Sequence, residues 1–225
     1  AFQTEFGFVP CYVNSRLTAQ GICTACEVDI YGALSEYIGT CLTGECVTLL
    51  DINNTVPADL YAADIAGRFP YRLNETFMGF HCGNTPMCRL TKGTMKYQLI
   101  MNRGLENGGE PDITRGTLEG DIAPGEITFY RLQGNKDSQL QAYVAEGEVL
   151  PVACHSFGGI GVFAIPEMNR FYRHVLIEGG YPHHGAVAFK HTGKAFFALM
   201  KLLGVEKVQF NQPAGMLYKS ENPFA

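Results

Sequence analysis

Short apolar runs separated by glycine, proline, asparagine or aspartate fill the chain between residues 54 and 165. Runs of about four to eight residues with such boundaries, and without a long helical period, are typical of β-strands. The predicted strands are Thr76–His81, Thr94–Met101, Glu126–Leu132, Leu140–Val144, Val149–Cys154 and Gly161–Ile165, with an exposed loop at Asn102–Pro111. This spacing predicts an antiparallel sheet or a barrel-like arrangement over this part of the chain.

The two ends of the chain have a different pattern, in which helical and strand signals alternate. The predicted elements there are a helix at Ile22–Ile38 ending near Gly39 and Gly44, a strand at Cys46–Leu50 ending at Asp51, a strand at Ala186–Phe189 and an amphipathic helix at His191–Leu203. We therefore expect an α+β protein, in which the end of an α/β domain is followed by a mostly β domain, with the boundary near residues 53–58.

Charge and hydropathy limit the classes of function. The net charge of −5 argues against nucleic-acid binding through a basic surface, and no apolar run approaches the roughly 18 residues of a membrane-spanning helix. The chain starts AFQTEFGFVP, without a methionine or a signal-peptide pattern, so we expect a piece of a longer protein. The low charged fraction of 17% suggests a surface that meets a partner.

Eight cysteines lie among long hydrophobic segments, which predicts reduced, buried thiols in a cytoplasmic protein rather than a disulfide scaffold. Cys23 and Cys26 have the spacing of a redox or zinc motif, but no second pair of ligands follows, so we interpret them as structural thiols within the first predicted helix. Gly158–Gly161 lacks the strand–turn–helix context of a dinucleotide site, and we expect a tight turn there.

Carboxylates and histidines offer a mixed oxygen and nitrogen ligand set, which suits Mn²⁺ or a similar divalent ion. Its members are Glu27 in the first predicted helix, Asp51 at a strand end, His81 at another strand end, and the adjacent pair His183 and His184. Purely structural interpretations of the same residues stay open. Glu27 could occupy an exposed helical position, Asp51 could form a turn or a helix cap, and the histidines could be hydrogen-bonded core residues. Adjacent residues in a strand point to opposite faces, so we expect at most one of the two adjacent imidazoles to face the site.

Three segments together resemble the C-terminal half of the L-fucose isomerase/L-arabinose isomerase family. They are ACEVDIYGALSEYIGT at 25–40 with the strand ending in Asp51, GFHCGNTP at 79–86, and EGGYPHHGAVAFKHTGKAFFALMKLLGV at 178–205. The resemblance implies that residues 1–55 are the end of an α/β middle domain and that residues 56–225 are a β-barrel-like C-terminal domain with a C-terminal helix.

The resemblance also implies roles for individual residues. Glu27 and Asp51 match carboxylates that bind metal and transfer protons, and His184 matches the metal-binding histidine. His183 stands where fucose isomerases have asparagine and where the arabinose branch has histidine. His81 resembles, more loosely, a second metal-binding histidine of the arabinose branch. We expect His81, Asn84 and His183 to contact substrate.

The implied activity is a metal-dependent aldose–ketose isomerisation through an enediol, acting on an open-chain deoxy sugar or pentose. L-Fucose, D-arabinose, L-arabinose and sulfonated or phosphorylated sugars are the open alternatives for the substrate, and a non-catalytic sugar-binding domain or an assembly domain is the alternative function. The family implies partners in the missing N-terminal domains and in a homo-oligomer. We therefore expect the isolated chain to bind divalent metal weakly and to turn over sugar negligibly.

Overall fold

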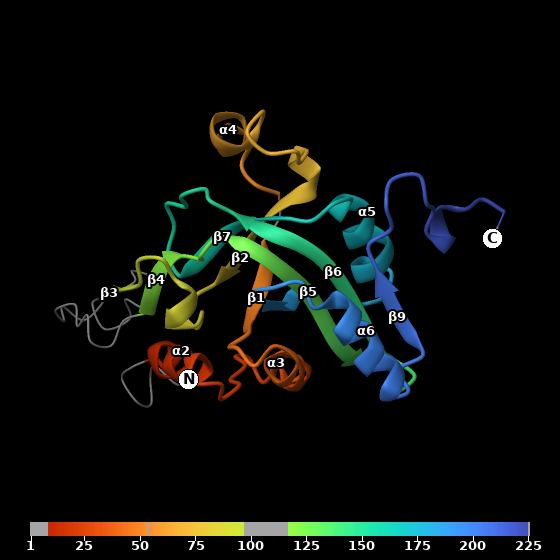
Figure 1. Ribbon diagram of the computed structural model, residues 1–225, viewed down its shortest axis with the longest axis horizontal. Coiled ribbons are helices and arrows are strands. Elements are labelled where there is room, and N and C mark those ends of the chain that lie inside the picture. Colours follow the sequence, from red (N-terminus) through yellow and green to blue (C-terminus); the bar gives the residue numbers. More distant parts are fainter. Residues whose placement is uncertain (1–8, 54, 97–116, 225) are drawn as a thin grey trace, which may run out of the picture.

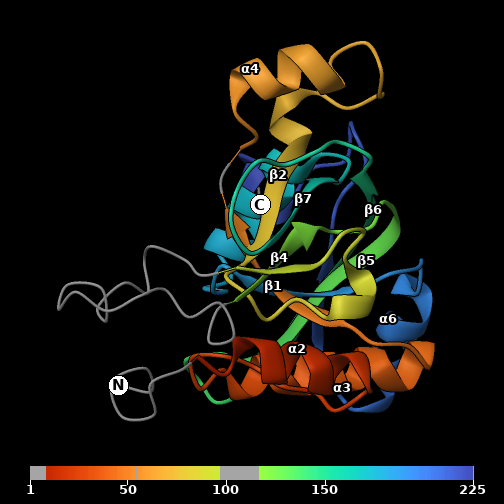
Figure 2. The ribbon, with the colours of Figure 1, turned by 90° about the vertical axis from the view of Figure 1, so that its left-hand side faces the viewer.

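The computed structural model describes residues 9–53, 55–96 and 117–224, and shows a mixed α+β fold built on one mostly antiparallel sheet. The helices of the described part are α2 (Cys11–Ala19), α3 (Ile30–Thr43), α4 (Ala58–Leu60), α5 (Met168–Phe171) and α6 (Gly193–Leu202). Figures 1 and 2 show α2 and α3 together at one end of the sheet and α4 at the opposite end.

Nine strands form the sheet in the part of the chain that the structure describes. They are β1 (Thr48–Asn53), β2 (Thr76–His81), β3 (Thr94–Lys96), β4 (Thr117–Asp121), β5 (Gly125–Gly134), β6 (Leu140–Leu150), β7 (Gly159–Ala164), β8 (His184–Ala188) and β9 (Lys207–Phe210). Their order is β3-β4-β7-β2-β1-β8-β5-β6-β9, and β6 also pairs with β7, so six strands close into a ring of pairings. Two of the pairings are parallel, namely β4 with β7 and β6 with β9.

Strand β5 has a nearly continuous buried run because both of its faces are covered. Phe129 belongs to one core cluster, in which its ring contacts those of Phe77 and Tyr143. The next residue, Tyr130, belongs to a second cluster and packs against Phe196 of α6. Alternating side chains of one strand thus hold two cores together.

Most of the predicted strands are present in the structure. The prediction for β2 is confirmed residue for residue, and β1, β5, β7, β8 and helix α6 lie within a few residues of their predicted bounds. The separate strand predicted at Val149–Cys154 is wrong, because β6 continues to Leu150 and is followed by Pro151. The predicted strand at Thr94–Met101 is described only as far as Lys96, and the predicted loop at Asn102–Pro111 lies outside the described residues.

The helix predicted at Ile22–Ile38 is placed too early. Helix α3 begins at Ile30 and ends in a left-handed Gly44, so only its end was predicted well. Asp29 caps this helix by accepting a hydrogen bond from the Gly32 N–H. The residues before it, Glu27 and Val28, have positive φ angles, which a right-handed α-helix does not contain. Cys23 and Cys26 consequently lie in a loop, and the prediction that they belong to a helix is wrong.

The first 55 residues contribute to the same sheet as the later ones. Strand β1 lies between β2 and β8 and is antiparallel to both. Figure 1 shows β1 at the centre of the molecule. The predicted domain division at residue 55 stays a prediction. The barrel-like form of the C-terminal domain also stays a prediction, because β3, β4 and β9 lie outside the ring of six strands. Among the described residues, no helix is both long and apolar enough to cross a membrane.

A buried carboxyl group joins the loop before α3 to the sheet. Glu36 of α3 is 1% exposed, and its two oxygens accept hydrogen bonds from the backbone N–H groups of Leu49 and Thr24. Burial raises the pKa of Glu36 from 4.5 to about 8, although both hydrogen bonds favour the charged form. The folded state therefore holds this proton more tightly than the unfolded chain does.

We predict that the free energy of unfolding decreases as the pH rises from about 4.5 to about 8, because the folded protein binds the Glu36 proton over that range and the unfolded chain does not. The variant Glu36→Gln cannot titrate there and should flatten this decrease, whereas Glu126→Gln, at an exposed position, should keep it. Urea unfolding at several pH values measures the free energy of unfolding of the wild type and of both variants. An equally steep decrease in Glu36→Gln would show that another group is responsible.

Candidate metal centre

The register of two antiparallel strands brings Asp51 and His184 together. Asp51 of β1 is paired directly with His184 of β8, and directly paired residues project to the same face of a sheet. His184 Nε2 lies 3.2 Å from Asp51 Oδ1. The sequence predicted Asp51 at the carboxyl end of a strand in an α/β sheet. Asp51 instead lies inside β1, with two strand residues after it, and the antiparallel pairing with β8 creates the site.

The other ring nitrogen of His184 is held by a carboxylate that the sequence analysis missed. His184 Nδ1 lies 2.9 Å from Asp29 Oδ2, and the guanidinium of Arg131 binds both Asp29 oxygens at 2.7 and 2.9 Å. Arg131 also donates to the His184 carbonyl at 3.2 Å. An added Cβ on Gly32 would lie 2.6 Å from Asp29 Oδ2, so this close approach requires glycine.

This arrangement directs His184 Nε2 toward Asp51. Arg131 is 4% and Asp29 11% exposed at the side chain, so their ion pair is shielded from water. Burial opposes ionisation of Asp29, but hydrogen bonds from Arg131, Gly32 and His184 lower its pKa to about 2. A histidine whose Nδ1 is fixed by a carboxylate is the usual form of a metal-binding histidine, because Nε2 is then oriented toward the ion.

Glu27 reaches the same imidazole from the loop before α3. Its Oε2 lies 3.6 Å from His184 Nε2, and its side chain is 69% exposed, so it lies on the open side of the site. Glu27 and Val28 both have φ near +60°, a conformation that is unfavourable for any residue with a side chain and most unfavourable for β-branched valine. Strain of this kind persists where the surrounding structure fixes the backbone, and it gathers at functional sites.

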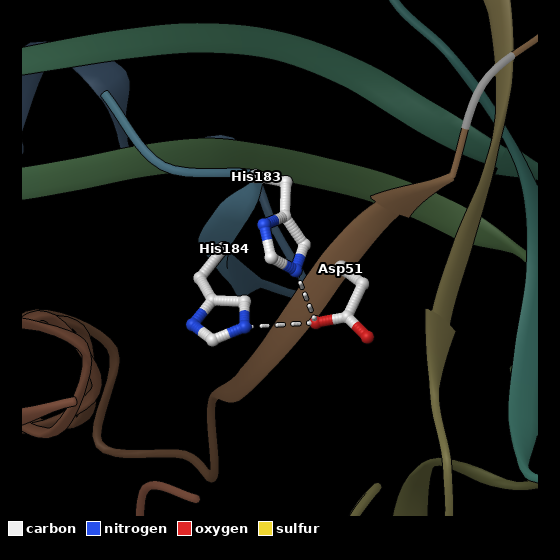
Figure 3. Close-up of side chains that lie close together, drawn as sticks. All are labelled: Asp51, His183 and His184. Carbon is white, nitrogen blue, oxygen red and sulfur yellow. Dashed lines mark ion pairs between the residues drawn. The ribbon is translucent and has the colours of Figure 1, made fainter. Parts of the chain in front are cut away.

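The expectation that only one of the two adjacent histidines faces the site is wrong. Asp51, His183 and His184 offer ligand atoms that all lie within 4.8 Å of one another, and Figure 3 shows both imidazoles directed at the same Asp51 oxygen. His183 Nε2 lies 3.8 Å from Asp51 Oδ1. Alternation does not separate the pair because β8 begins at His184, which leaves His183 outside the strand.

His81 and Asn84 make contacts beside this group rather than within it. His81 is buried, and its Nδ1 lies 3.4 Å from the backbone nitrogen of Asn84. Asp51 is paired with Phe80, so His81, the next residue of β2, projects to the other face of the sheet. The Asn84 side chain donates to the Thr24 carbonyl at 3.3 Å. Substrate contact by His81 and Asn84 stays a prediction.

The donor atoms around His184 Nε2 fit a divalent cation. Ligands at about 2.2 Å from an octahedral ion are about 3 Å apart, and Asp51 Oδ1 lies 3.2 Å and Glu27 Oε2 3.6 Å from this nitrogen. The hydrogen bond to Asp51 is the main cause that raises the pKa of His184, with Asp29 adding to it and burial opposing it. Two carboxylates and imidazole nitrogen are ligands suited to Mn²⁺ and similar ions.

Comparison with known proteins identifies the family. Residues 79–211, which include His81, Asn84, His183 and His184, match the sequence model of the L-fucose isomerase C-terminal domain. The chain belongs to this family. Glu27 and Asp51 precede the matched segment.

The similarity to individual proteins extends over nearly the whole chain. A sulfoquinovose isomerase of Clostridium sp. (strain MSTE9) is 28% identical over 208 residues, which cover 91% of this chain and 41% of the relative. Sulfoquinovose isomerases of Alkalicoccus urumqiensis and Priestia aryabhattai are each 24% identical, over 92% and 91% of this chain. The chain thus spans about two fifths of the length of the curated relatives that it matches.

The variant Asp29→Ser tests the support of His184. Serine caps a helix about as well as aspartate but is too short to bind Arg131 and His184, so the guanidinium would stay buried without its partner. We predict a loss of about 3 kcal/mol in the free energy of unfolding, measured in urea. The exposed pair of Lys136 and Asp137 gives the control: Asp137→Ser should change stability by less than about 0.5 kcal/mol. An equally small change in Asp29→Ser would contradict the assigned role.

Proposed function

We propose that the chain is the C-terminal part of a divalent-metal-dependent aldose–ketose isomerase. The observation that carries the proposal is the convergence of Asp51 and Glu27 on the one imidazole nitrogen of His184 that Asp29 leaves available. Membership in the L-fucose isomerase C-terminal domain family supports a sugar isomerase over an unrelated metal protein.

His184 and Asp51 would hold the ion, with Glu27 as a third ligand on the open side and His183 next to them. A bound divalent cation, with Mn²⁺ as our choice, supplies the positive charge that stabilises an enediolate as it develops on neighbouring sugar oxygens. The carboxylates of Glu27 and Asp51 would move the proton between C1 and C2 of the open-chain sugar. Glu27 is the more accessible of the two, with 69% of its side chain exposed against 31% for Asp51.

The remaining part of the longer protein would complete the substrate site. The matched relatives are more than twice as long as this chain, and the exposure of Glu27 leaves the site open on one side. Walls supplied by other domains or by a second subunit would exclude water and position the sugar. His183, whose imidazole approaches Asp51, is our first candidate for a contact with sugar hydroxyls. Asn84 and His81 come after it, because both are buried and His81 projects from the other face of β2.

Sulfoquinovose is the first substrate that we would test, because the matched relatives are named for it. L-Fucose, D-arabinose and L-arabinose complete the panel, since the chemistry at C1 and C2 is common to these aldoses. The identity of 24–28% supports the reaction class more than any one sugar.

Metal binding and turnover together test the proposal. We predict that Mn²⁺ binding to the chain, followed by calorimetry, weakens at least about tenfold in Asp51→Asn, His184→Gln and Glu27→Gln, because each change removes a ligand. The control Glu126→Gln alters an exposed glutamate of β5 and should bind like the wild type. In a full-length parent, Glu27→Gln and Asp51→Asn should lower ketose formation by about 10²–10⁴-fold or more.

The isolated chain gives a further control for the same assay. It should form ketose negligibly beside the parent, because the walls of the site are missing. Undiminished Mn²⁺ binding in all three variants would contradict the metal site. Wild-type turnover in the parent variants would contradict the catalytic assignment, and equal turnover by chain and parent would show that the active site has been misplaced.

A further inference from the structure

Two cysteine sulfurs lie next to each other away from the candidate metal centre. Cys46 precedes β1, and Cys88 lies in the short helical turn η3 (Met87–Arg89) that follows β2. Their Sγ atoms are 2.8 Å apart, about three quarters of an ångström more than a disulfide bond. Cys41 and Cys88 are exposed, so the expectation of buried thiols is wrong for these two, whereas Cys11 is buried and the other cysteines are half-buried.

The sheet explains why residues 46 and 88 meet. Strands β1 and β2 are antiparallel neighbours, so the start of β1 and the end of β2 lie at the same end of the sheet. Cys46 comes two residues before β1 begins at Thr48, and Cys88 follows the end of β2 at His81. The topology of the fold therefore fixes the proximity of the two segments.

Contacts that do not involve sulfur hold the two segments together. Arg89, adjacent to Cys88, donates to Glu45 Oε2 at 2.8 Å and to the Cys46 carbonyl at 3.3 Å. The Arg89 guanidinium also lies over the Phe189 ring, 4.5 Å from its centroid. Lys190 pairs with the Glu45 carboxylate from the other side. Because the backbones are positioned by these groups, joining the sulfurs requires little rearrangement.

Access to the pair differs between its two members. Cys88 is exposed and Cys46 is half-buried, so a small reagent in solvent can reach the pair. Burial of its sulfur and the neighbouring Cys46 thiol raise the pKa of Cys88 to about 11, and Arg89 partly opposes this. The Cys88 thiolate is therefore scarce at neutral pH, and exchange should be faster in mildly alkaline solution.

We propose that Cys46 and Cys88 form a reversible disulfide by exchange with a low-molecular-weight disulfide. The thiolate of one cysteine attacks a sulfur of the small disulfide, which forms a mixed disulfide and releases one small thiolate. The thiolate of the other cysteine then attacks the protein sulfur of the mixed disulfide and releases the second small thiolate. The two protein thiols are oxidised, the small disulfide is reduced to two thiols, and an excess of reduced small thiol reverses the reaction.

Oxidised glutathione is the probe for the test. The 225-residue chain is incubated with it at mildly alkaline pH, unreacted thiols are blocked, and intact mass and disulfide-linked peptides are analysed. We expect the loss of two hydrogen masses and a linked pair of peptides that contain Cys46 and Cys88. Because Glu45 precedes Cys46, cleavage after glutamate and arginine isolates Cys46 from the other cysteines in its tryptic peptide.

Serine variants separate this pair from the others. Cys46→Ser and Cys88→Ser should each lose the internal disulfide and accumulate the mixed disulfide on the remaining cysteine, because the second attack has no thiolate. Cys41→Ser removes another exposed thiol and should oxidise like the wild type. Circular dichroism checks that each variant is folded. No internal disulfide in the wild type would overturn the proposal, as would linkage of a different pair, such as the neighbouring Cys11 and Cys82.

Discussion

The buried ion pair between Asp29 and Arg131 determines the geometry of the candidate metal centre. It joins three parts of the fold: the loop before α3, strand β5 and, through His184, strand β8. Asp29 also caps α3, so the same carboxylate sets where the helix begins and how the imidazole is oriented. Removing either charge would leave the other buried without a partner, which costs more free energy than the pair itself contributes.

The remaining geometry follows from the sheet and from one strained loop. Antiparallel pairing places Asp51 directly opposite His184, and both histidines at the start of β8 reach the same carboxylate oxygen. Two consecutive residues in left-handed conformation turn the loop so that Glu27 approaches His184 from solvent. Glu36 fixes this loop through the Thr24 N–H. A short, strained segment is thus held between a cap and a buried carboxyl group.

The sequence predicted the strands well because their signals are local. Strand β2 was predicted with its exact bounds. Residue types and positions made Asp51 and the pair His183 and His184 candidates, and the family resemblance selected His184 as the metal ligand. The start of α3 was misplaced because the apolar period continues through residues whose backbone is left-handed. Asp29 offered a local signal, an aspartate just before an apolar helical run, but its partner Arg131 is 102 residues away and only the folded sheet brings them together.

The most direct test of the candidate metal centre is a crystal structure of the chain with Mn²⁺, in which anomalous scattering locates the ion. We predict a peak within about 2.0–2.6 Å of His184 Nε2 and of carboxylate oxygens of Asp51 and Glu27, while Asp29 stays bound to His184 Nδ1 and to Arg131. A peak elsewhere, or a structure in which Asp29 leaves Arg131 to bind the ion, would contradict the claim that this ion pair orients the metal-binding histidine.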